Sequence, residues 1–543
     1  MTETPPSPPT PRAEANARSA DAERIASGYE STGSALEMGA VLLDGTSYPQ
    51  ARIRVPLAMV NRHGLIAGAT GTGKTKTLQV LTEQLSAAGV PVVVADIKGD
   101  LSGLARAGTS NDRIAVRAVD TGDDWAPTAY PVDFLALGGV GFGAPLRATM
   151  TSFGPTLLAK VLGCNSTQES SLGLIFHYAD SAGLPLLDLK DLRAVIQYLT
   201  SDDGKTDLKN LGGLSSATAG VILRQLITLE TQGGDVFFGE PEFDTADLLR
   251  TDSQGRGVIS SIELANLQDR PMLFSTFLMW LLADLFHELP EVGDLDKPKL
   301  VFFFDEAHLL FNDASKAFLD AVTQTIRLIR SKGVGIFFVT QNPTDVPDSV
   351  LGQLGNRVQH ALRAFTPDDA AALAKAVKTY PKTKDYDLSE ALTQLGTGEA
   401  VVTVLAESGA PTPVAWTRLR APRSLMAQLD PAAQAQAVAG SPLSARYGQP
   451  LDRESAYERL TAKLAPPAAE EPDELPEPAE PAEQRTSRAD SRPPQGGFAD
   501  AASGLFGAVL GSFARNAGSS LGREISRDLF GTAPRRRRRT RRR

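Results

Sequence analysis

The stretch that most constrains this chain is a cluster of glycines followed by a lysine and a threonine. Residues 68–75 read G-A-T-G-T-G-K-T and fit the pattern G-x-x-x-x-G-K-[ST]. The apolar segment H-G-L-I-A-G precedes them, and after them Leu78, Leu81 and Leu85 recur at helical spacing. A strand, a glycine loop and a helix in this order predict a phosphate-binding loop.

Each residue type in this loop has a physical reason to be there. Glycines let the loop turn tightly, so that backbone N–H groups point inward at phosphate oxygens, and the helix adds the positive end of its dipole. Lys74 would place a charge on the β- and γ-phosphates, and Thr75 would offer a hydroxyl to Mg²⁺. A dinucleotide-binding loop needs another glycine spacing and no Lys-Thr pair. The expected nucleotide-binding residues are Gly68, Ala69, Thr70, Gly71, Thr72, Gly73, Lys74 and Thr75.

A pair of acidic residues further along the chain supplies what a nucleotide loop needs next. In K-L-V-F-F-F-D-E-A-H, four apolar residues run directly into Asp305 and Glu306. Ligands bind at the carboxyl ends of strands in open α/β sheets. We expect Asp305 to hold Mg²⁺, through water, and Glu306 to polarise the attacking water. The alternative is an acidic strand end that caps the next helix.

Polar residues around a third buried strand complete the candidate site. Gln341 ends the strand in G-I-F-F-V-T-Q-N-P, where an amide could bond both the γ-phosphate and the lytic water. Arg330, then Arg327 and more weakly Arg357, are candidates for an arginine supplied in trans, although a solvated helix face or a salt bridge explains them too. His63 and His308 are expected to be hydrogen-bonded packing residues rather than metal ligands.

The bulk properties of the chain limit its class and its partners. A single cysteine, Cys164, excludes an internal disulfide, and the N-terminal residues show no apolar signal segment, so a cytoplasmic protein is expected. The longest apolar run, residues 271–286, is too short to span a bilayer and contains Asp284. The net charge is −9 although the last nine residues hold eight arginines, so the rest of the chain is acidic.

Changes of composition along the chain predict its organisation. The strand-loop-helix unit is followed by V-P-V-V-V-A-D-I, which indicates a βαβ unit and a parallel sheet covered on both faces. The fold class expected is therefore α/β. The predicted segments are a disordered N-terminus (1–33), the first part of an ATPase core (34–144), a helical insertion (145–295), the second part of the core (296–423), a Pro/Ala/Glu-rich linker (424–495), and short helices with an Arg-rich tail (496–543).

Four short stretches of the sequence together resemble a known family. N-R-H-G-L-I-A-G-A-T-G-T-G-K-T-K-T-L-Q, A-D-I-K-G-D-L-S-G-L-A, V-F-F-F-D-E-A-H-L-L-F and R-S-K-G-V-G-I-F-F-V-T-Q-N-P are similar to the HerA/FtsK superfamily of ring ATPases, and most of all to the bacterial HerA-like helicase-domain group. The resemblance runs from about residue 36 to 420 and weakly beyond residue 500. It implies a RecA-like P-loop core, a hexamer as the usual assembly, and ATP bound between subunits.

The resemblance also assigns roles to particular residues. It implies that Lys74 and Thr75 bind phosphate and Mg²⁺, that Asp305 and Glu306 are the metal and catalytic carboxylates, and that Gln341 senses the γ-phosphate. It also implies that Arg330 acts in trans. Asp96 and Asp100 fall where relatives also carry acidic residues, and their role stays open. Little chain precedes the core for the barrel with which HerA docks its nuclease, so a nuclease partner is not expected.

The resulting prediction is an Mg²⁺-dependent ATPase, a self-assembling ring that moves or unwinds DNA. Two alternatives stay open: a nucleotide-driven protein remodeller or membrane-associated assembly factor with the same ATPase site, and a protein in which ATP binding is only a switch. The arginine tail could bind nucleic-acid phosphates, an anionic membrane surface, or the acidic linker of a neighbouring subunit.

Overall fold

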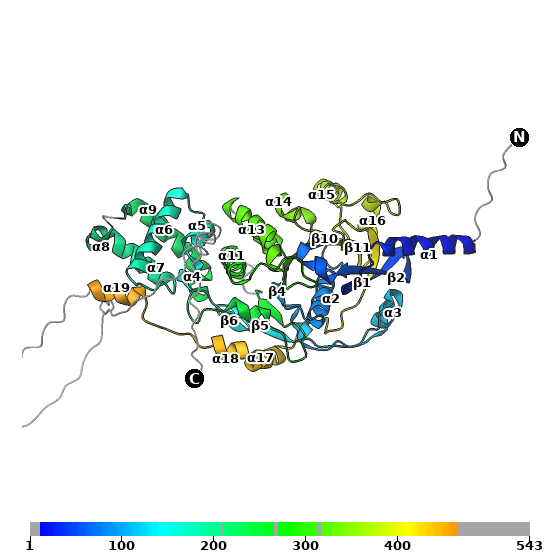
Figure 1. The fold of residues 1–543 in the computed structure, drawn as a ribbon, viewed down its shortest axis with the longest axis horizontal. Coiled ribbons are helices and arrows are strands. Elements are labelled where there is room, and N and C mark those ends of the chain that lie inside the picture. The colour runs from blue at the N-terminus through cyan, green and yellow to red at the C-terminus, as the bar shows by residue number, and fades with distance from the viewer. Residues whose placement is uncertain (1–10, 209–210, 265–269, 312–315, 465–543) are drawn as a thin grey trace, which may run out of the picture.

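A single large sheet forms the centre of the computed structural model, which describes residues 11–208, 211–264, 270–311 and 316–464 (Figure 1). In spatial order its twelve strands are β2 (Thr46–Pro56), β1 (Ala35–Leu43), β12 (Ala415–Leu419), β11 (Glu399–Thr403), β10 (Asn356–Gln359), β3 (Gly64–Ala67), β9 (Val334–Thr340), β8 (Leu300–Phe304), β4 (Val92–Asp96), β7 (Ile259–Glu263), β5 (Val132–Leu137) and β6 (Ala144–Leu146).

The strands from β10 to β6 in this order run parallel, and those from β2 to β11 pair antiparallel with their neighbours. The sheet is thus mostly parallel, and the expected α/β fold class is confirmed. Parallel neighbours need crossover connections, and these contain helices except between β5 and β6, which residues 138–143 join without one. The helices are α1 (Pro11–Ser27), α2 (Lys74–Ala87), α3 (Asp112–Thr121), α4 (Met150–Phe153), α5 (Pro155–Val161), α6 (Ser166–Ser181), α7 (Leu189–Thr200), α8 (Asp202–Asp207), α9 (Ser216–Leu229), α10 (Asp235–Phe237), α11 (Pro271–Glu288), α12 (His308–Phe311), α13 (Lys316–Ile329), α14 (Asp348–Leu351), α15 (Pro367–Val377), α16 (Leu388–Gln394), α17 (Pro431–Gly440), α18 (Pro442–Tyr447) and α19 (Ala456–Leu464).

Both faces of the parallel sheet are buried, which explains why its strands read as unbroken apolar runs. In β8, Val301 and Phe303 face the cluster that contains the apolar side of α2, whereas Phe302 and Phe304 face the opposite cluster. The cluster that contains Phe302 and Phe304 continues into α11, α13 and the helical part of the molecule. Side chains alternate between the two faces of a strand, so every position in β8 must be apolar.

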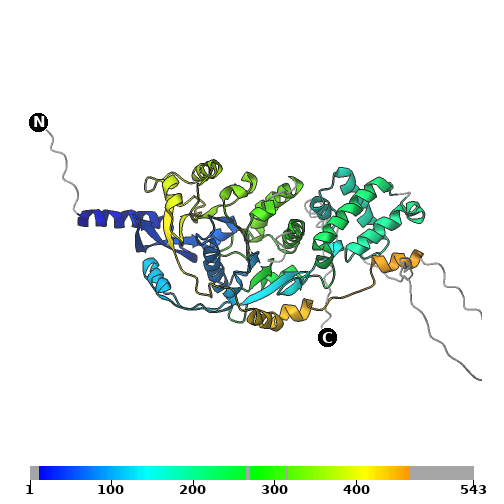
Figure 2. The ribbon, with the colours of Figure 1, turned by 180° about the vertical axis from the view of Figure 1, so that it is seen from behind.

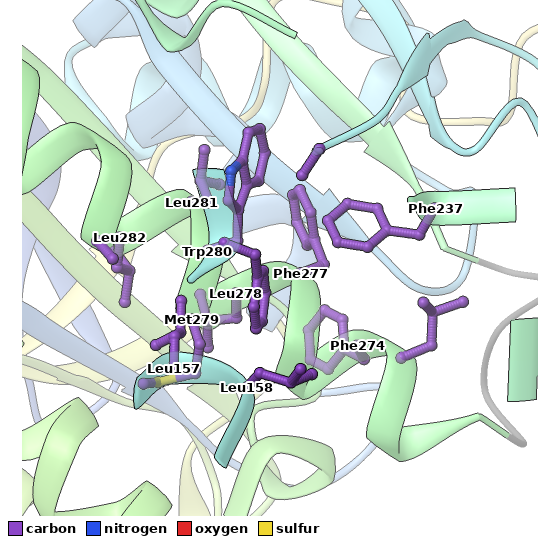
Figure 3. Packing of buried hydrophobic residues seen from close by; sticks show 14 of the residues in the cluster. Leu157, Leu158, Phe237, Phe274, Phe277, Leu278, Met279, Trp280, Leu281 and Leu282 are labelled. Atoms are coloured by element: carbon purple, nitrogen blue, oxygen red, sulfur yellow. The ribbon is translucent and has the colours of Figure 1, made fainter. Parts of the chain in front are cut away.

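The helical section lies beside the sheet, at the end of the molecule farthest from α1 (Figure 1). Helices α4 to α9 form it, and α19 packs on α7. Figure 3 shows side chains of α11 beside Leu157 and Leu158 of α5 and beside α10, where Trp280 packs against Phe237 with ring centroids 5.8 Å apart. The predicted insertion (145–295) is not wholly helical, because β7 within it lies in the core sheet between β4 and β5.

The N-terminal residues are more ordered than their composition suggests. Residues 11–27 form α1, and Ala22, Ile25 and Tyr29 are buried against the antiparallel strands. The Tyr29 hydroxyl donates a hydrogen bond to the Val402 carbonyl at 2.8 Å. The prediction of disorder across residues 1–33 is therefore wrong from residue 11 onward, since buried Ala22 and Ile25 of α1, and Tyr29 just after it, pack on the strands. Residues 1–10 lie outside the described part.

A C-terminal strap, residues 420–464, runs from the sheet to the helical section (Figure 2). At its start, the backbone N–H groups of Arg423 and Ser424 donate to the carboxylate of Glu83 in α2, at 2.8 and 2.9 Å. At its end, the Tyr457 N–H donates to buried Asp191 in α7 at 2.9 Å. The linker predicted for 424–495 is thus wrong as far as residue 464, because these hydrogen bonds and the burial of Leu443, Tyr447 and Leu460 in the hydrophobic core hold the segment.

The remaining C-terminal predictions, which are the Pro/Ala/Glu-rich segment after residue 464 and the short helices with the arginine tail, lie outside the described residues. Among the residues that the structure describes, no helix combines the length and apolar character needed to cross a bilayer.

Candidate nucleotide-binding site

The glycine loop joins β3 to α2, at the carboxyl edge of the parallel strands. Gly68 has φ +151°, and a Cβ there would lie 2.5 Å from the Cβ of His360. Gly73 precedes the helix in a left-handed conformation with φ +114° and ψ 9°. An L-residue is strained in either conformation, so these glycines are required by the backbone path itself.

Three neighbouring segments hold the loop in place. The Gly68 N–H donates to the Thr340 carbonyl at 3.2 Å, and the Ala69 N–H donates to the Ala361 carbonyl at 2.8 Å. The Thr72 carbonyl accepts from the Gly398 N–H at 3.0 Å. The loop is therefore fixed to the ends of β9 and β10 and to the turn before β11 before any ligand arrives.

Lys74 is buried inside this loop and turned back onto it. Its ammonium donates to the Ala69 carbonyl at 3.1 Å, and the residue is 7% exposed. Burial lowers the pKa of Lys74, and the ammonium of Lys98 lowers it further, whereas the carboxylates of Glu306 and Asp305 raise it. A buried cation with one backbone partner can exchange that partner for a phosphate oxygen.

Asp305 follows β8, and only β9 separates β8 from β3. Two strand spacings amount to about 10 Å, so Asp305 and the glycine loop lie at the same edge of the sheet. The carboxylate is 1% exposed; its Oδ1 accepts the Glu306 N–H at 2.9 Å, and its Oδ2 has no hydrogen-bond partner among the described residues. Burial raises the pKa of Asp305 to about 7, although Lys98 opposes the rise.

These groups fit a magnesium ion. A buried carboxylate oxygen without a partner is costly unless something positive binds it, and the Thr75 hydroxyl belongs to the same loop. Within the described chain, no three His, Cys, Asp or Glu side chains are grouped to hold a metal by themselves. Mg²⁺ prefers one or two protein oxygens together with water and phosphate oxygens, so Asp305 and Thr75 match a metal that arrives with a nucleotide.

Glu306 has a backbone conformation unusual for its type, with φ +47°. Its Oε1 forms an ion pair with the Lys98 ammonium, and its Oε2 lies 3.2 Å from Nδ1 of His308. Burial alone would raise the pKa of Glu306, but Lys98, His308 and Lys74 together bring it below its ordinary value. Glu306 is therefore a carboxylate at neutral pH, as a group that activates water must be.

Lys98 is a residue of this site that the sequence did not reveal. It follows β4, the strand next to β8, in a loop shaped by Asp96. The buried carboxylate of Asp96 accepts the N–H groups of Lys98, Gly99 and Leu101 at 3.2, 2.7 and 2.9 Å. Asp96, whose role was open, thus presents Lys98 to Glu306. Only the strand order could have signalled this, because the residues are 208 positions apart in the chain.

Gln341 follows β9, which does lie between the two motif strands β3 and β8. Its side chain is exposed at the carboxyl edge. The turn after it is fixed by Asp345, whose Oδ2 accepts the Thr340 hydroxyl at 2.6 Å and the Asn342 N–H at 2.9 Å. The amide therefore stands at the same edge as the glycine loop, where its role as a sensor stays a prediction.

The candidate arginines lie at the opposite edge of the sheet. Arg330 begins a 3-10 turn, Arg330–Lys332, just before β9, and the seven residues of that strand span about 20 Å. Its guanidinium lies 3.9 Å from Asp294, which also lies 3.5 Å from Arg62. Arg327 is exposed on α13, and Arg357 lies at the start of β10. None of the three predicted arginines reaches the glycine loop of its own chain.

The two histidines differ in their surroundings. His63 is buried between Ile326 and Ile336: its Nε2 bonds the Ile326 carbonyl at 2.7 Å, and its Nδ1 accepts the Ile336 N–H at 3.0 Å. The expected packing role of His63 is confirmed. His308 is partly exposed and contacts Glu306 instead, so it belongs to the candidate site.

The sequence is similar to a known family of proteins. Residues 42–539 match the family described as Helicase HerA-like C-terminal. A protein of Methanocaldococcus jannaschii described as a probable helicase is 34% identical over 119 residues, which span 21% of this chain and 21% of that relative.

Two solved structures are similar at low sequence identity. The plasmid coupling protein TrwB in complex with ADP and Mg²⁺ aligns with a TM-score of 0.48 and 14% identity, covering 74% of this chain and 98% of that chain. VirB4 of Thermoanaerobacter pseudethanolicus aligns with a TM-score of 0.46 and 14% identity, covering 72% and 97%. The family match spans far more than half of the sequence, and the chain therefore belongs to the HerA-like C-terminal helicase family.

Proposed function

We propose that this protein is an Mg²⁺-dependent ATPase that works as a ring on DNA. The observation that carries the ATPase is the shared edge of β3, β9 and β8, where the glycine loop, Lys74, Asp305 and Glu306 come together. Family membership adds the expectation of a helicase or translocase.

The residues of the chain divide the chemistry among them. The backbone N–H groups of residues 68–75 and the Lys74 ammonium bind and orient the triphosphate. Mg²⁺, when bound with the nucleotide, neutralises phosphate charge. Asp305 and Thr75 hold that ion in place, and Glu306 accepts a proton from the attacking water.

The position of Arg330 supports the ring. Stabilisation of the transition state by an arginine is worth a factor of about 10³ or more in related hydrolases. Arg330 lies at the far edge of the sheet from its own glycine loop, so it can serve only the site of another copy. An assembly that brings this edge of one copy to the nucleotide edge of the next supplies it, and such a head-to-tail contact forms a ring when its rotation closes.

The test is ATP turnover of the full chain, measured without nucleic acid, with single-stranded DNA and with double-stranded DNA, together with the mass of the assembly. DNA-stimulated turnover that falls at high salt supports the proposal, since phosphate contacts are salt-dependent. Turnover indifferent to DNA would favour a protein remodeller with the same site. Nucleotide binding without turnover would favour a switch and reject the enzyme.

A further inference from the structure

The site contains a second lysine, Lys98, for which the proposed reaction has given no role. Lys98 has its ammonium on Glu306, the proposed catalytic carboxylate, yet its side chain remains 41% exposed. Glu306 itself is only 7% exposed. Lys98 is therefore the accessible half of the pair, and it can change partners without any rearrangement of the core.

The backbone around Lys98 is held on both sides. Asp96 binds the loop through three N–H groups, and the Lys98 carbonyl accepts the side-chain amide of Gln428, in the C-terminal strap, at 3.2 Å. With the main chain anchored, the flexible part is the four-carbon stem of the lysine. The ammonium can thus move over a few ångströms while the loop stays in place.

The charges around the Lys98 ammonium favour its movement toward a bound nucleotide. Lys74 and Lys98 lie close enough that, after burial, Lys98 is the next largest cause of the lowered pKa of Lys74. The described groups facing them are Asp305 and Glu306, with Asp345 and Asp100 further out. Bringing a triphosphate and Mg²⁺ into this site adds net negative charge next to the two carboxylates, and a second ammonium would offset it.

Geometry points to the terminal phosphate. The attacking water must lie within about 3 Å of Glu306 and about 3–3.5 Å of the γ-phosphorus. A cation that touches the Glu306 carboxylate is therefore about one water molecule away from the γ-phosphate oxygens. The β-phosphate, deeper in the glycine loop beside Lys74, is farther from it.

We propose that Lys98 is a binding residue for the γ-phosphate, which leaves Glu306 when ATP binds and returns to it when ADP remains. Glu306 is then free to activate water only when there is a γ-phosphate to attack. This inference rests on the proposed function, and it adds that the site separates a nucleoside triphosphate from a diphosphate through Lys98.

The experiment measures the Kd of the full chain for Mg²⁺-ADP and for a Mg²⁺-bound, non-hydrolysable ATP analogue, by calorimetry. In Lys98→Met, the Kd for the analogue should rise about tenfold or more, the size of one lost charge-assisted hydrogen bond. The Kd for ADP should stay within about twofold, because Lys74 holds the β-phosphate. Lys98→Arg should keep most of the discrimination, and Lys98→Gln, which retains a polar group, should lose it as Met does.

The matched control is Lys382→Met, at an exposed lysine between α15 and α16, which should leave both constants unchanged. If Lys98→Met lowered the affinity for ADP and for the analogue equally, the inference would be overturned, because the loss of a purely structural residue lowers both affinities. Unchanged discrimination would overturn it as well. A wild-type chain that binds neither nucleotide would overturn the proposed function itself, which separates the two failures.

Discussion

At the scale of single residues, the site balances two buried or half-buried cations against two carboxylates. Lys74 is bound by its own loop, Lys98 by Glu306, and one oxygen of Asp305 by nothing that the structure describes. A left-handed glutamate costs about 1 kcal/mol or more. The fold imposes this backbone conformation at Glu306, in the short turn between β8 and α12. Because each charged residue of the site has a different partner, the role of each can be tested by its own substitution.

Replacement of Glu306 by Gln should separate binding from hydrolysis. The amide keeps the size of the side chain but cannot accept the proton of water, so turnover should fall about 10²- to 10⁴-fold while nucleotide affinity persists. Phosphate release and a binding isotherm on the same preparation measure this. Lys74→Ala is the comparison, because it should lose the binding itself. Turnover within about twofold of wild type in Glu306→Gln would remove this residue from the mechanism.

His63 should make stability depend on pH in the acid range. Burial, with Arg330 and Arg62 nearby, lowers its pKa to about 4, whereas an unfolded histidine titrates near 6.5. Below pH 6.5 the unfolded chain therefore takes up the proton first, and the contribution of His63 to stability is lost as pH falls toward 4. The loss amounts to about 3 kcal/mol over that window.

The measurement is urea unfolding from pH 7 to 4 for wild type and His63→Gln. The variant should be less stable at pH 7 but should lose less stability on acidification, which removes the opposing effects of other groups from the comparison. His177→Gln, at an exposed position on α6, should follow the wild-type curve. Parallel curves for wild type and His63→Gln would contradict the tautomer and burial described above.

At the scale of elements, the C-terminal strap is held by buried carboxylates as well as by apolar residues, such as Leu443 and Leu460, that pack into the core of the molecule. Glu83 of α2 binds its start, and Asp191 of α7 binds its end. Between them Gln434 donates to Glu263, and Ser441 donates to Asp133. The strap therefore connects the helix that follows the glycine loop to the helical section.

Asp191→Ala should release the end of the strap. The carboxylate is fully buried and accepts the N–H groups of Leu187, Asp188 and Tyr457, which would be left without partners. Unpaired buried donors cost about 1–3 kcal/mol each when water cannot reach them, so unfolding free energy should drop by about 2–4 kcal/mol. Limited proteolysis should cut the segment near α19 first. Asp203→Ala, exposed on α8, is the control; equal resistance of both variants would refute the anchoring role.

At the scale of the whole molecule, the sheet has two edges with different contents. The carboxyl edge has the glycine loop and the acidic pair, and the amino edge has Arg62 and Arg330 around Asp294. A single copy cannot bring them together, because rigid strands separate them. If Arg330 takes part in catalysis as proposed, a neighbouring copy must supply it.

Mixing two inactive variants should restore activity if sites are shared. Arg330→Ala keeps an intact glycine loop, and Lys74→Ala keeps an intact arginine, so a mixed assembly contains some complete sites. We expect each variant alone to be slow and the mixture to exceed the sum of its parts, measured as phosphate release after subunit exchange. Arg224→Ala, at an exposed position on α9, should turn over like wild type. Full activity of Arg330→Ala alone would remove this arginine from the reaction.

Sequence alone determined the features whose physics is local. The eight residues of the glycine loop are contiguous, and Gly68, Gly71 and Gly73 have positive φ angles that favour glycine, so the sequence pattern predicts the loop. The parallel strands are also recognisable from sequence, because a strand that is covered on both faces must be apolar at every position. Asp305 and Glu306 were readable because they follow such a run at a strand end, where ligands bind.

Only the tertiary structure decided which distant segments meet. Lys98 lies in a segment that carries the family resemblance, but the sequence assigns it no role, and only the order β8-β4 places it on Glu306. The same holds for β7, hidden in a helical stretch, and for Arg330, whose edge depends on the direction of β9. The strap, too, is held by buried carboxylates far away in the chain. Which remote segments pair is set by the packing of the whole fold, and the local amino-acid composition of a segment does not indicate its partner.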